Sequence, residues 1–495
     1  MKRYLLVSAA FAAACGGAQS AGPVPPATTA TGPAASAQAP AGPDYAKLPK
    51  PAAAPNWTLE AAKTWKLENG MKVYYLRQGS TPLVSLLLVL PRGAATDPKG
   101  KEGLTALTTD MLDEGAGGKT ALELSEELQR LGTDYYGSTD VDGVTLGMNL
   151  LAENFGPSAK LLSDIVRRPA LSPKELVRRR DQRVAEELSQ QSEPGHGRAI
   201  VLRHALFGEG YGSWLPTGTE GSLKKLSLAD VKRQYLATFV PDGAALVVVG
   251  GIEEAPVKQA LAESFGDWSG KATSTEAAVS DAPVKNGVYF VDYKGTTQSA
   301  IAFAHRAGAE TSPEYFPAKV FSRAFGEAFT SRVNLNLRED KGYTYGARSA
   351  FSRWTKTGFF AIAANVKRET TRASIDEVVK ELNGICGPRP LSQTERDDAV
   401  NGLLLGFPGR FEQNGDVAAQ LSMLPVYGRP NDWYSRWPGN VRSVTAEAAN
   451  AVAKSYCDAK DYVVVVAGDR SVVEPTLAGL EMPLQFFDAK GKLVK

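Results

Sequence analysis

The chain has few of the residues that bind metals or form disulfides. Its 495 residues include only three histidines and three cysteines. The histidines are His196, His204 and His305, and none has a second histidine within metal-ligand spacing. A hydrolytic zinc ion needs about three protein ligands, and two histidines on one helix commonly supply two of them. We therefore expect this chain to bind no metal and no other cofactor.

Cysteine is scarce beyond the amino terminus, where Cys386 and Cys457 are the only thiols besides Cys15. In an oxidising compartment these two could form a disulfide. Two buried free thiols fit the sequence at least as well, so the sequence leaves this choice open.

No strong excess of one charge is present. The formal net charge is only +2 over 495 residues. The one basic cluster is Arg178-Arg179-Arg180 with Arg183. The same predicted helix also carries four acidic residues, Glu175, Asp181, Glu186 and Glu187. A helix with both signs of charge is typical of a solvated face, so nucleic-acid binding gains no support.

Long apolar runs are also absent. The longest strong run in the body of the chain, Leu83–Leu90, has the length of a strand. The amino terminus has a basic start, Lys2-Arg3, followed by a mainly apolar stretch from Tyr4 to Ala14 that is too short to span a bilayer. We interpret residues 1–15 as a signal peptide for secretion.

The end of this signal resembles the cleavage box of bacterial lipoproteins. It reads Ala12-Ala13-Ala14-Cys15, with Ala12 where that box usually has Leu. The resemblance implies that Cys15 is the lipidation site, with each buried methylene of the acyl chains adding about 0.8 kcal/mol of membrane affinity. Gly16, which stands where some lipoproteins have Asp, implies anchoring to the outer membrane, facing the periplasm. Ordinary cleavage near Ala14 would instead give a soluble periplasmic protein.

Residues 16–56 are almost all Ala, Pro, Thr, Ser and Gly. Such a composition buries too little apolar surface to offset the entropy of ordering. We expect this segment to be a flexible tether between the anchor and a soluble body.

The body contains an internal repeat. One helix-start signal, Ser172-Pro173-Lys174-Glu175, recurs at Ser392-Gln393-Thr394-Glu395, and in both places Ser and Glu can form a reciprocal capping box. Asn69-Gly70 before a strand recurs at Asn286-Gly287. We predict two homologous domains, 57–270 and 286–487, joined by a linker at 271–285. Two unrelated domains with generic capping signals are the alternative.

Each copy has the pattern of an α+β domain. In the first copy, Val73–Arg77 and Leu83–Leu90 read as strands, and 134–140 with 144–151 reads as a hairpin pair. Helices are predicted near 154–167 and 173–191, and the second copy repeats this order with a long helix near 317–340. Strand pairs interleaved with helix pairs favour a mixed, mainly antiparallel sheet with helices on one face.

Several landmarks in this order resemble the insulinase/pitrilysin family of zinc metallopeptidases, over about residues 57–487. They are Asn69-Gly70, Gly103-Leu104, the helix with Glu186-Glu187, Tyr211-Gly212 and Pro216-Thr217-Gly218. The resemblance implies that two such domains form half of a clam-shell chamber. It also implies that an active member carries His-x-x-Glu-His on its first helix.

This chain departs from the family at that motif. Aligning the family's element on 103–111 places Ala106 and Asp110 at the two His positions and Thr109 at the Glu. Ala cannot bind a metal and Thr cannot act as the general base. Glu186 or Glu187 holds the place of the third ligand, where a surface side chain is the expected interpretation. Asp110 and Glu114 are expected to form an exposed acidic turn rather than a cation site.

The second copy keeps a different family element. Arg338 and Tyr345, seven residues apart around Gly342, match the Arg and Tyr of the family's C-terminal domain. Gly342 can end a helix in a left-handed cap, which would place Arg338 on the last turn and Tyr345 on the next strand. In the family this pair reaches the substrate held at the zinc of another domain. The alternative is that Arg338 pairs with a nearby Glu and Tyr345 packs in the sheet.

Together these features predict the non-zinc subunit of a heterodimeric peptidase. The chain would be inactive alone, and Arg338 and Tyr345 would bind peptide and complete the site of a partner that carries the zinc. Peptides or unfolded segments in the periplasm are the expected substrates. An inert binding or scaffold protein of the same fold is the main alternative. A self-sufficient hydrolase lacks support, since no nucleophile-elbow or Cys-His signature is present.

Overall fold

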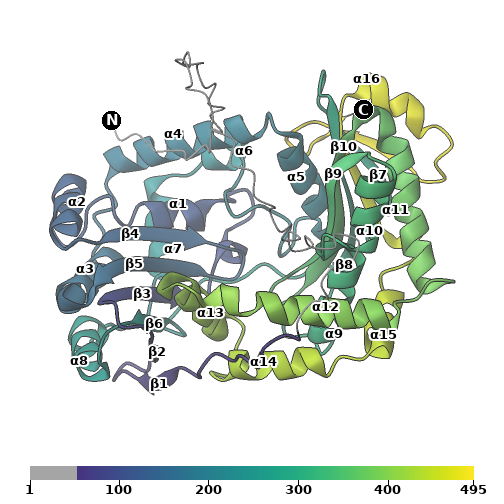
Figure 1. The fold of residues 1–495 in the computed structure, drawn as a ribbon. Coiled ribbons are helices and arrows are strands. Elements are labelled where there is room, and N and C mark those ends of the chain that lie inside the picture. Colours follow the sequence, from purple (N-terminus) through teal and green to yellow (C-terminus); the bar gives the residue numbers. More distant parts are fainter. Residues whose placement is uncertain (1–52, 495) are drawn as a thin grey trace, which may run out of the picture. The chain divides into compact units, whose positions relative to one another are not determined.

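Two mixed β-sheets organise residues 53–494, which are the residues that the computed structural model describes (Figure 1). The first sheet has the order β1-β2-β6-β3-β5-β4 and the second the order β13-β12-β7-β11-β8-β10-β9. The first contains β1 (Lys63–Lys66), β2 (Lys72–Arg77), β3 (Leu83–Leu90), β4 (Asp134–Thr139), β5 (Val144–Leu151) and β6 (Ala245–Gly250). The second contains β7 (Gly287–Asp292), β8 (Gln298–Ala307), β9 (Thr344–Arg353), β10 (Gly358–Lys367), β11 (Val463–Gly468), β12 (Leu484–Phe487) and β13 (Leu493–Val494).

The two sheets share one topology. The order β2-β6-β3-β5-β4 in the first sheet corresponds to β7-β11-β8-β10-β9 in the second. In each, the first pair is parallel, β2 with β6 and β7 with β11, and the other three pairs are antiparallel. The predicted α+β class with two mixed, mainly antiparallel sheets is confirmed.

The helices fall into two groups along the chain. Those of the first half are α1 (Leu104–Asp110), α2 (Ala121–Arg130), α3 (Phe155–Arg167), α4 (Pro173–Gln190), α5 (Pro194–Phe207), α6 (Glu220–Leu223), α7 (Leu228–Thr238) and α8 (Glu254–Phe265). Those of the second half are α9 (Tyr315–Ser322), α10 (Arg332–Asn334), α11 (Thr371–Cys386), α12 (Gln393–Gly406), α13 (Asn414–Val426), α14 (Trp433–Arg442), α15 (Ala446–Lys454) and α16 (Arg470–Val473). No helix within residues 53–494 is long and apolar enough to cross a membrane.

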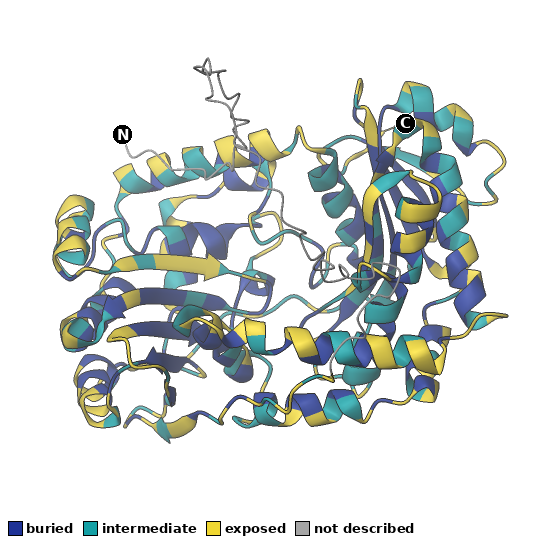
Figure 2. Cartoon of the chain, in the orientation of Figure 1, coloured by how far each residue is buried: buried dark blue, intermediate teal, exposed yellow. Residues whose placement is uncertain are grey.

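The central strands are covered on both faces. In β3, Leu86 and Leu88 pack with the helices of the first half, whereas Leu87 and Val89 point to the opposite face. Strand β6 alternates in the same way, as expected for side chains with a period of two. The inner strands are buried along their length while the edge strand β4 is largely exposed (Figure 2). The prediction that Leu83–Leu90 is covered on both faces is confirmed.

The second face is covered by a helix from the other half of the chain. Helix α13 packs against β3 and β6 of the first sheet, and α5 packs against β7, β8 and β11 of the second (Figure 1). Both helices occupy the same place in the repeat, at 194 and 414. Neither helix was predicted. Helix α5 contains Pro194 and Gly197 and α13 contains Pro425, which are residue types of low helix propensity. The prediction of helices on one face only is therefore incomplete.

The repeated helix-start signal is realised differently in its two copies. At Ser392 the side chain accepts from the N–H of Glu395 and the Glu395 carboxylate accepts from the N–H of Ser392, so the predicted capping box forms. At Ser172 the helix begins as predicted, but no side-chain cap bond forms. The Glu175 carboxylate instead accepts from Arg178 Nε at 2.7 Å.

Other predicted boundaries also differ from the structure. The helix expected near 317–340 is broken at residues 328–331 and contains two π-helical turns, η3 (Arg323–Glu327) and η4 (Leu335–Asp340). The N–H of Ala54 donates to Asn401 Oδ1 at 3.1 Å, so the last residues assigned to the tether are held by the second half. The second sheet continues to residue 494, beyond the predicted domain end at 487. The signal peptide, Cys15 and the tether up to residue 52 lie outside the described residues.

Cys386 and Cys457 form a disulfide, with Cα atoms 5.9 Å apart. It joins the last residue of α11 to the segment after α15. The sequence fitted two free thiols at least as well as a disulfide and left the choice open. A bond of this kind persists in oxidising compartments.

The disulfide should contribute substantially to stability. In the loop-entropy model, closing a loop over the sequence separation of 71 residues lowers the entropy of the unfolded chain and raises the free energy of unfolding by about 4 kcal/mol. We expect the double variant Cys386→Ser/Cys457→Ser to lose stability of that order in urea unfolding. Adding a thiol reductant should reproduce the loss in the native protein and leave the variant unchanged; equal stabilities with and without reductant would contradict the assignment.

Candidate functional site

The helix that aligns with the zinc helix of the family is α1. It begins after Gly103, whose φ of 89° suits glycine. The Asp97 carboxylate accepts from the N–H groups of Gly103 and Thr105, each at 2.8 Å, and from the Thr105 hydroxyl. These bonds satisfy backbone donors that the start of a helix leaves free. Asp97 thereby fixes the position of α1 against the loop before it.

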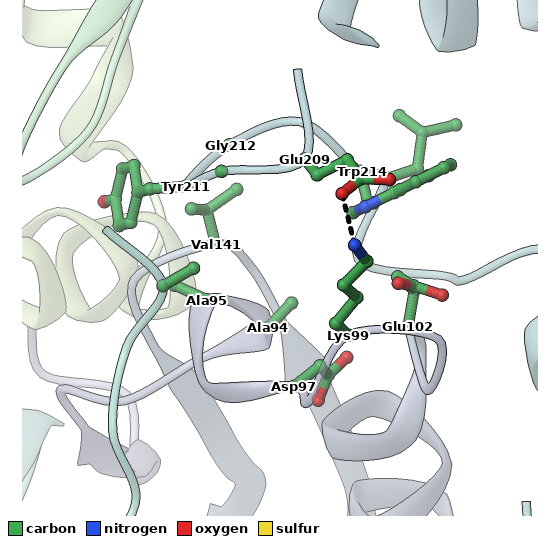
Figure 3. Close-up of a pocket in the computed structure, with 13 residues that line it drawn as sticks. Ala94, Ala95, Asp97, Lys99, Glu102, Val141, Glu209, Tyr211, Gly212 and Trp214 are labelled. Atoms are coloured by element: carbon green, nitrogen blue, oxygen red, sulfur yellow. Dashed lines mark ion pairs between the residues drawn. The ribbon is translucent and has the colours of Figure 1, made fainter. Parts of the chain in front are cut away.

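A small pocket adjoins Asp97. Its volume is about 90 Å³, and Lys99 points across it to the Glu209 carboxylate, at 2.5 Å (Figure 3). Trp214 and Glu102 lie beside this pair (Figure 3). The pocket is smaller than a site for an ordinary small-molecule ligand.

Two of the three positions of the zinc motif, those of the first His and the Glu, are part of the packing. Ala106 and Thr109 are buried in α1. The Thr109 hydroxyl donates to the carbonyl of Thr105 at 2.9 Å and lies 2.9 Å from the hydroxyl of Thr139 on β4. Thr109 therefore links the helix to the sheet, and neither side chain can bind a metal or remove a proton from water.

Asp110, at the second His position, is held by arginines from α4. Arg183 Nε donates to the Asp110 carboxylate, and Arg183 Nη2 contacts the carbonyl of Ala106 at 3.3 Å. Arg179 lies between two acids, 3.2 Å from Glu114 and 3.9 Å from Asp110. The prediction of an exposed acidic turn is wrong, because both carboxylates are largely buried and paired.

Glu187, at the position of the third ligand, is also not a surface residue. Only 4% of it is exposed, and its Oε1 lies 3.2 Å from His196 Nε2 and 3.1 Å from Gln191 Nε2. Its second oxygen has no hydrogen-bond partner. Glu186 is exposed, as predicted, and accepts from Gln182.

These residues do not fit a zinc ion. Of the two His positions on α1, only Asp110 offers a carboxylate. That carboxylate is neutralised by Arg183, whose own charge would repel a cation. Within residues 53–494 no group of three His, Cys, Asp or Glu side chains could hold a metal ion. Ion pairs between α1 and α4 stand where the family has its metal.

We expect the Asp110 pairs to stabilise the contact between α1 and α4. Asp110→Asn leaves the partly buried Arg183 without its counter-ion and should cost about 2 kcal/mol in the free energy of unfolding. The double variant Asp110→Asn/Arg183→Gln should lose less than the sum of the two single variants. Strict additivity in urea unfolding would show that the pair is not a unit.

Asp113 lies three residues beyond Asp110, and burial raises its pKa to about 6, with Glu114 adding to the shift. Because this pKa lies above the unfolded value, ionisation in the folded state costs free energy that grows from about pH 4 to pH 6 and then stays constant. Asp113→Asn should therefore be more stable than the native protein at pH 7.5, by about 3 kcal/mol, and equal to it near pH 4. Unfolding measured at both pH values tests this; a difference independent of pH would contradict it.

Arg338 and Tyr345 lie where the sequence places them. Arg338 is on η4, the last turn before Gly342, whose φ of 62° ends the helix in the left-handed conformation. The Gly342 N–H donates to the carbonyl of Arg338 at 3.1 Å. Tyr345 follows on β9. A π-helical turn at this point is typical of functional segments.

A β-bulge directs Tyr345 outward. Tyr345 and Gly346 on β9 both lie opposite Asn365 on β10, because the register shifts between Ala364 and Val366. The Thr344 hydroxyl donates to the carbonyl of Asn365 at 2.7 Å and stabilises the irregularity. Bulges re-aim side chains at sheet edges. As a result 90% of Tyr345 is exposed, and the alternative that it packs in the sheet is wrong.

Arg338 and Tyr345 line one open cavity of about 310 Å³. The remaining lining residues are Gln298, Glu339, Gly342, Tyr343, Thr344 and Lys367. The Arg338 guanidinium lies 3.4 Å from the Glu339 carboxylate and over the exposed ring of Phe329. The expected alternative of a pair with a nearby Glu is thus present, but the pair is solvent-accessible and leaves the guanidinium facing the cavity.

Sequence reasoning missed the residues that act through distant partners. Arg179 and Arg183 read as a solvated face, since their acidic partners at the end of α1 and in the segment after it are about 70 residues away in the chain. Nothing in the sequence singled out Lys367 as a functional residue, because a lone lysine at the end of a strand is common. A search for cations facing the degenerate motif could have found the arginines.

Two protein-family models match the chain. The model described as insulinase (peptidase family M16) matches residues 72–208, and the model described as peptidase M16 inactive domain matches residues 225–403. Together they cover more than half of the sequence. The predicted resemblance to the insulinase/pitrilysin family is confirmed.

Relatives and solved structures agree with these matches. The chain is 21% identical over 404 residues to the non-peptidase homolog YmxG of Helicobacter pylori, covering 80% of this chain and 92% of that protein. It is 23% identical to mitochondrial-processing peptidase subunit beta of Blastocladiella emersonii, covering 84% and 90%. The crystal structure of a peptidase M16 inactive domain from Pseudomonas fluorescens has a TM-score of 0.76 at 22% identity, covering 82% and 98%. This last likeness shows the fold alone.

Proposed function

Because the chain belongs to peptidase family M16 and lacks the family's zinc ligands, we propose that it is the non-zinc subunit of a two-chain peptidase. It would pair with a relative that carries His-x-x-Glu-His and the zinc ion. Each chain would contribute two domains to one chamber. This subunit would bind peptide and complete the partner's active site, and it would be inactive alone.

One contrast carries the proposal. The metal half of the site has been replaced by ion pairs between α1 and α4, which leave no open ligand position. The substrate half keeps Arg338 and Tyr345 on an accessible cavity, built by a π-helical turn, a left-handed glycine and a bulge. Exposed functional groups held by irregular backbone are not needed for folding, so their presence supports a binding role.

The chemistry of the two side chains suits a peptide at a neighbouring metal. A guanidinium presents a planar fork of donors that can hold a peptide carbonyl. A phenol can donate to the oxygen that gains negative charge when a carbonyl is attacked. Both groups bind and orient the substrate, and neither needs to supply the nucleophile.

Export to the periplasm fits this role. The predicted signal peptide, the lipidation site Cys15 and the outer-membrane anchor would place the body in the periplasm, where a disulfide between Cys386 and Cys457 persists. Cleavage without lipidation would leave it soluble in the same compartment.

The second candidate is a binding or scaffold protein without any part in catalysis. The name of the Helicobacter pylori relative, a non-peptidase homolog, favours it. Such a protein would keep the fold but would need neither Arg338 nor Tyr345. Substitutions at these two positions therefore separate the two candidates.

We expect the pair formed with the zinc-bearing subunit to cleave a fluorogenic peptide, and Arg338→Ala in this chain to lower kcat/KM by at least tenfold. Tyr345→Phe removes one donor to the developing oxyanion and should lower kcat by about 100-fold at a similar KM. The measurement is steady-state cleavage by mixed, purified chains.

Arg348→Ala serves as the control, because Arg348 is an exposed arginine on the same strand outside the cavity. It should leave cleavage unchanged. Full activity of the pair with both Arg338→Ala and Tyr345→Phe would remove the proposed role and favour the scaffold.

A further inference from the structure

The cavity beside Arg338 carries a net positive charge. Two cations, Arg338 and Lys367, and one acid, Glu339, line it. Lys367 is an exposed residue at the end of β10, and its ammonium group forms no ion pair with any residue in the described part of the chain. Its backbone N–H donates to the carbonyl of Tyr343 at 3.0 Å, which fixes the lysine at the rim. The cavity thus holds one more cation than acid.

The arginine is oriented by an aromatic ring. Its guanidinium carbon lies 4.3 Å from the centroid of Phe329, a residue that is 60% exposed. Stacking on a ring holds the plane of the guanidinium and leaves its edge free to donate.

Asn334 ties the ring to the strand that carries Tyr345. Its Nδ2 donates to the carbonyl of Phe329 at 2.7 Å, and its Oδ1 accepts from the N–H of Ala347 at 3.0 Å. Asn334 is buried, so both bonds are shielded from water. The Phe329 loop, the Arg338 turn and the bulge at Tyr345 therefore form one preorganised unit.

We propose that this cavity is a subsite for a carboxylate group of the bound peptide, held between Arg338 and Lys367. The inference rests on the proposed function and names the chemistry of the substrate that this subunit selects. Arginine can bind a carboxylate through two parallel hydrogen bonds, and lysine adds a point charge. The net charge of +1 among the three ionised lining residues matches one carboxylate, and the volume of about 310 Å³ lies at the small end of ligand pockets. Lys367 is the residue that this inference adds to the Arg and Tyr of the family resemblance.

The carboxylate has two possible sources, the free carboxyl end of a peptide and the side chain of Asp or Glu. Both present the same planar anion to the guanidinium. The amide of Gln298 lines the same cavity and can donate to its outer oxygen, which leaves the phenol of Tyr345 for the carbonyl that is attacked. The test separates the two sources.

Three fluorescent peptides of about ten residues are titrated against the full mature chain by fluorescence anisotropy. They share one sequence except at the carboxyl end and at one internal residue, and they are otherwise uncharged. One has a free carboxyl end and an internal Gln, one an amidated end and an internal Gln, and one an amidated end and an internal Glu. We expect at least one carboxylate peptide to bind about tenfold more tightly than the neutral peptide, and less so at high salt. Whichever carboxylate is preferred identifies the source.

Lys367→Met keeps the length of the side chain and removes its charge, so it should reduce this preference severalfold. Lys454→Met, at an exposed lysine at the end of α15, should leave it intact. Circular dichroism checks that both variants are folded. Equal binding of all three peptides by the native chain would overturn the carboxylate subsite and leave the proposed function standing. A preference that survives Lys367→Met would overturn the role of Lys367, and binding of none of the peptides would overturn both proposals.

Discussion

The exchange of helices between the two halves is the constraint on which the rest of the structure depends. Strands β3 and β6 are apolar on both faces, so one layer of helices cannot remove them from water. Helix α13 covers the second face, and α5 does the same for the second sheet. Burying a side chain such as Leu421 contributes about 2 kcal/mol, and several such residues line each exchanged helix. Neither half could separate without exposing the other's sheet.

This arrangement explains how the chain could lose a metal and keep its fold. In residues 53–494 the core runs through the sheets and the exchanged helices, whereas α1 and α4 meet at one edge of it. Ion pairs from Arg179 and Arg183 on α4 reach Asp110, the last residue of α1, and Arg179 also pairs with Glu114 in the segment after α1. Such ion pairs need oppositely charged partners in a suitable geometry. Unlike a catalytic metal, they need no exchangeable ligand position. In this chain the site is a closed structural contact, at the place where the family resemblance implies an open metal centre.

Local pattern predicted much of the fold, and partners distant in sequence account for what was missed. The strands Leu83–Leu90 and Val144–Leu151 have the predicted bounds, because an apolar run in the first and an alternating pattern in the second leave little choice of register. The glycine cap that places Arg338 was also predicted from local chemistry. Helices α5 and α13 were missed, since their burial depends on a sheet from the other half and their prolines and glycines have low helix propensity. The bulge at Tyr345, the disulfide and the arginines facing Asp110 likewise depend on contacts that no local pattern contains.

The central claim is that the partner chain carries the metal chemistry and that this chain contributes only groups that bind the peptide. Its most direct test is the zinc content of the isolated mature chain after dialysis against excess zinc and then against buffer. Inductively coupled plasma mass spectrometry should find much less than one zinc ion per chain, and no more in the native protein than in the Asp110→Ala variant. One zinc ion per native chain, lost in Asp110→Ala, would contradict the claim.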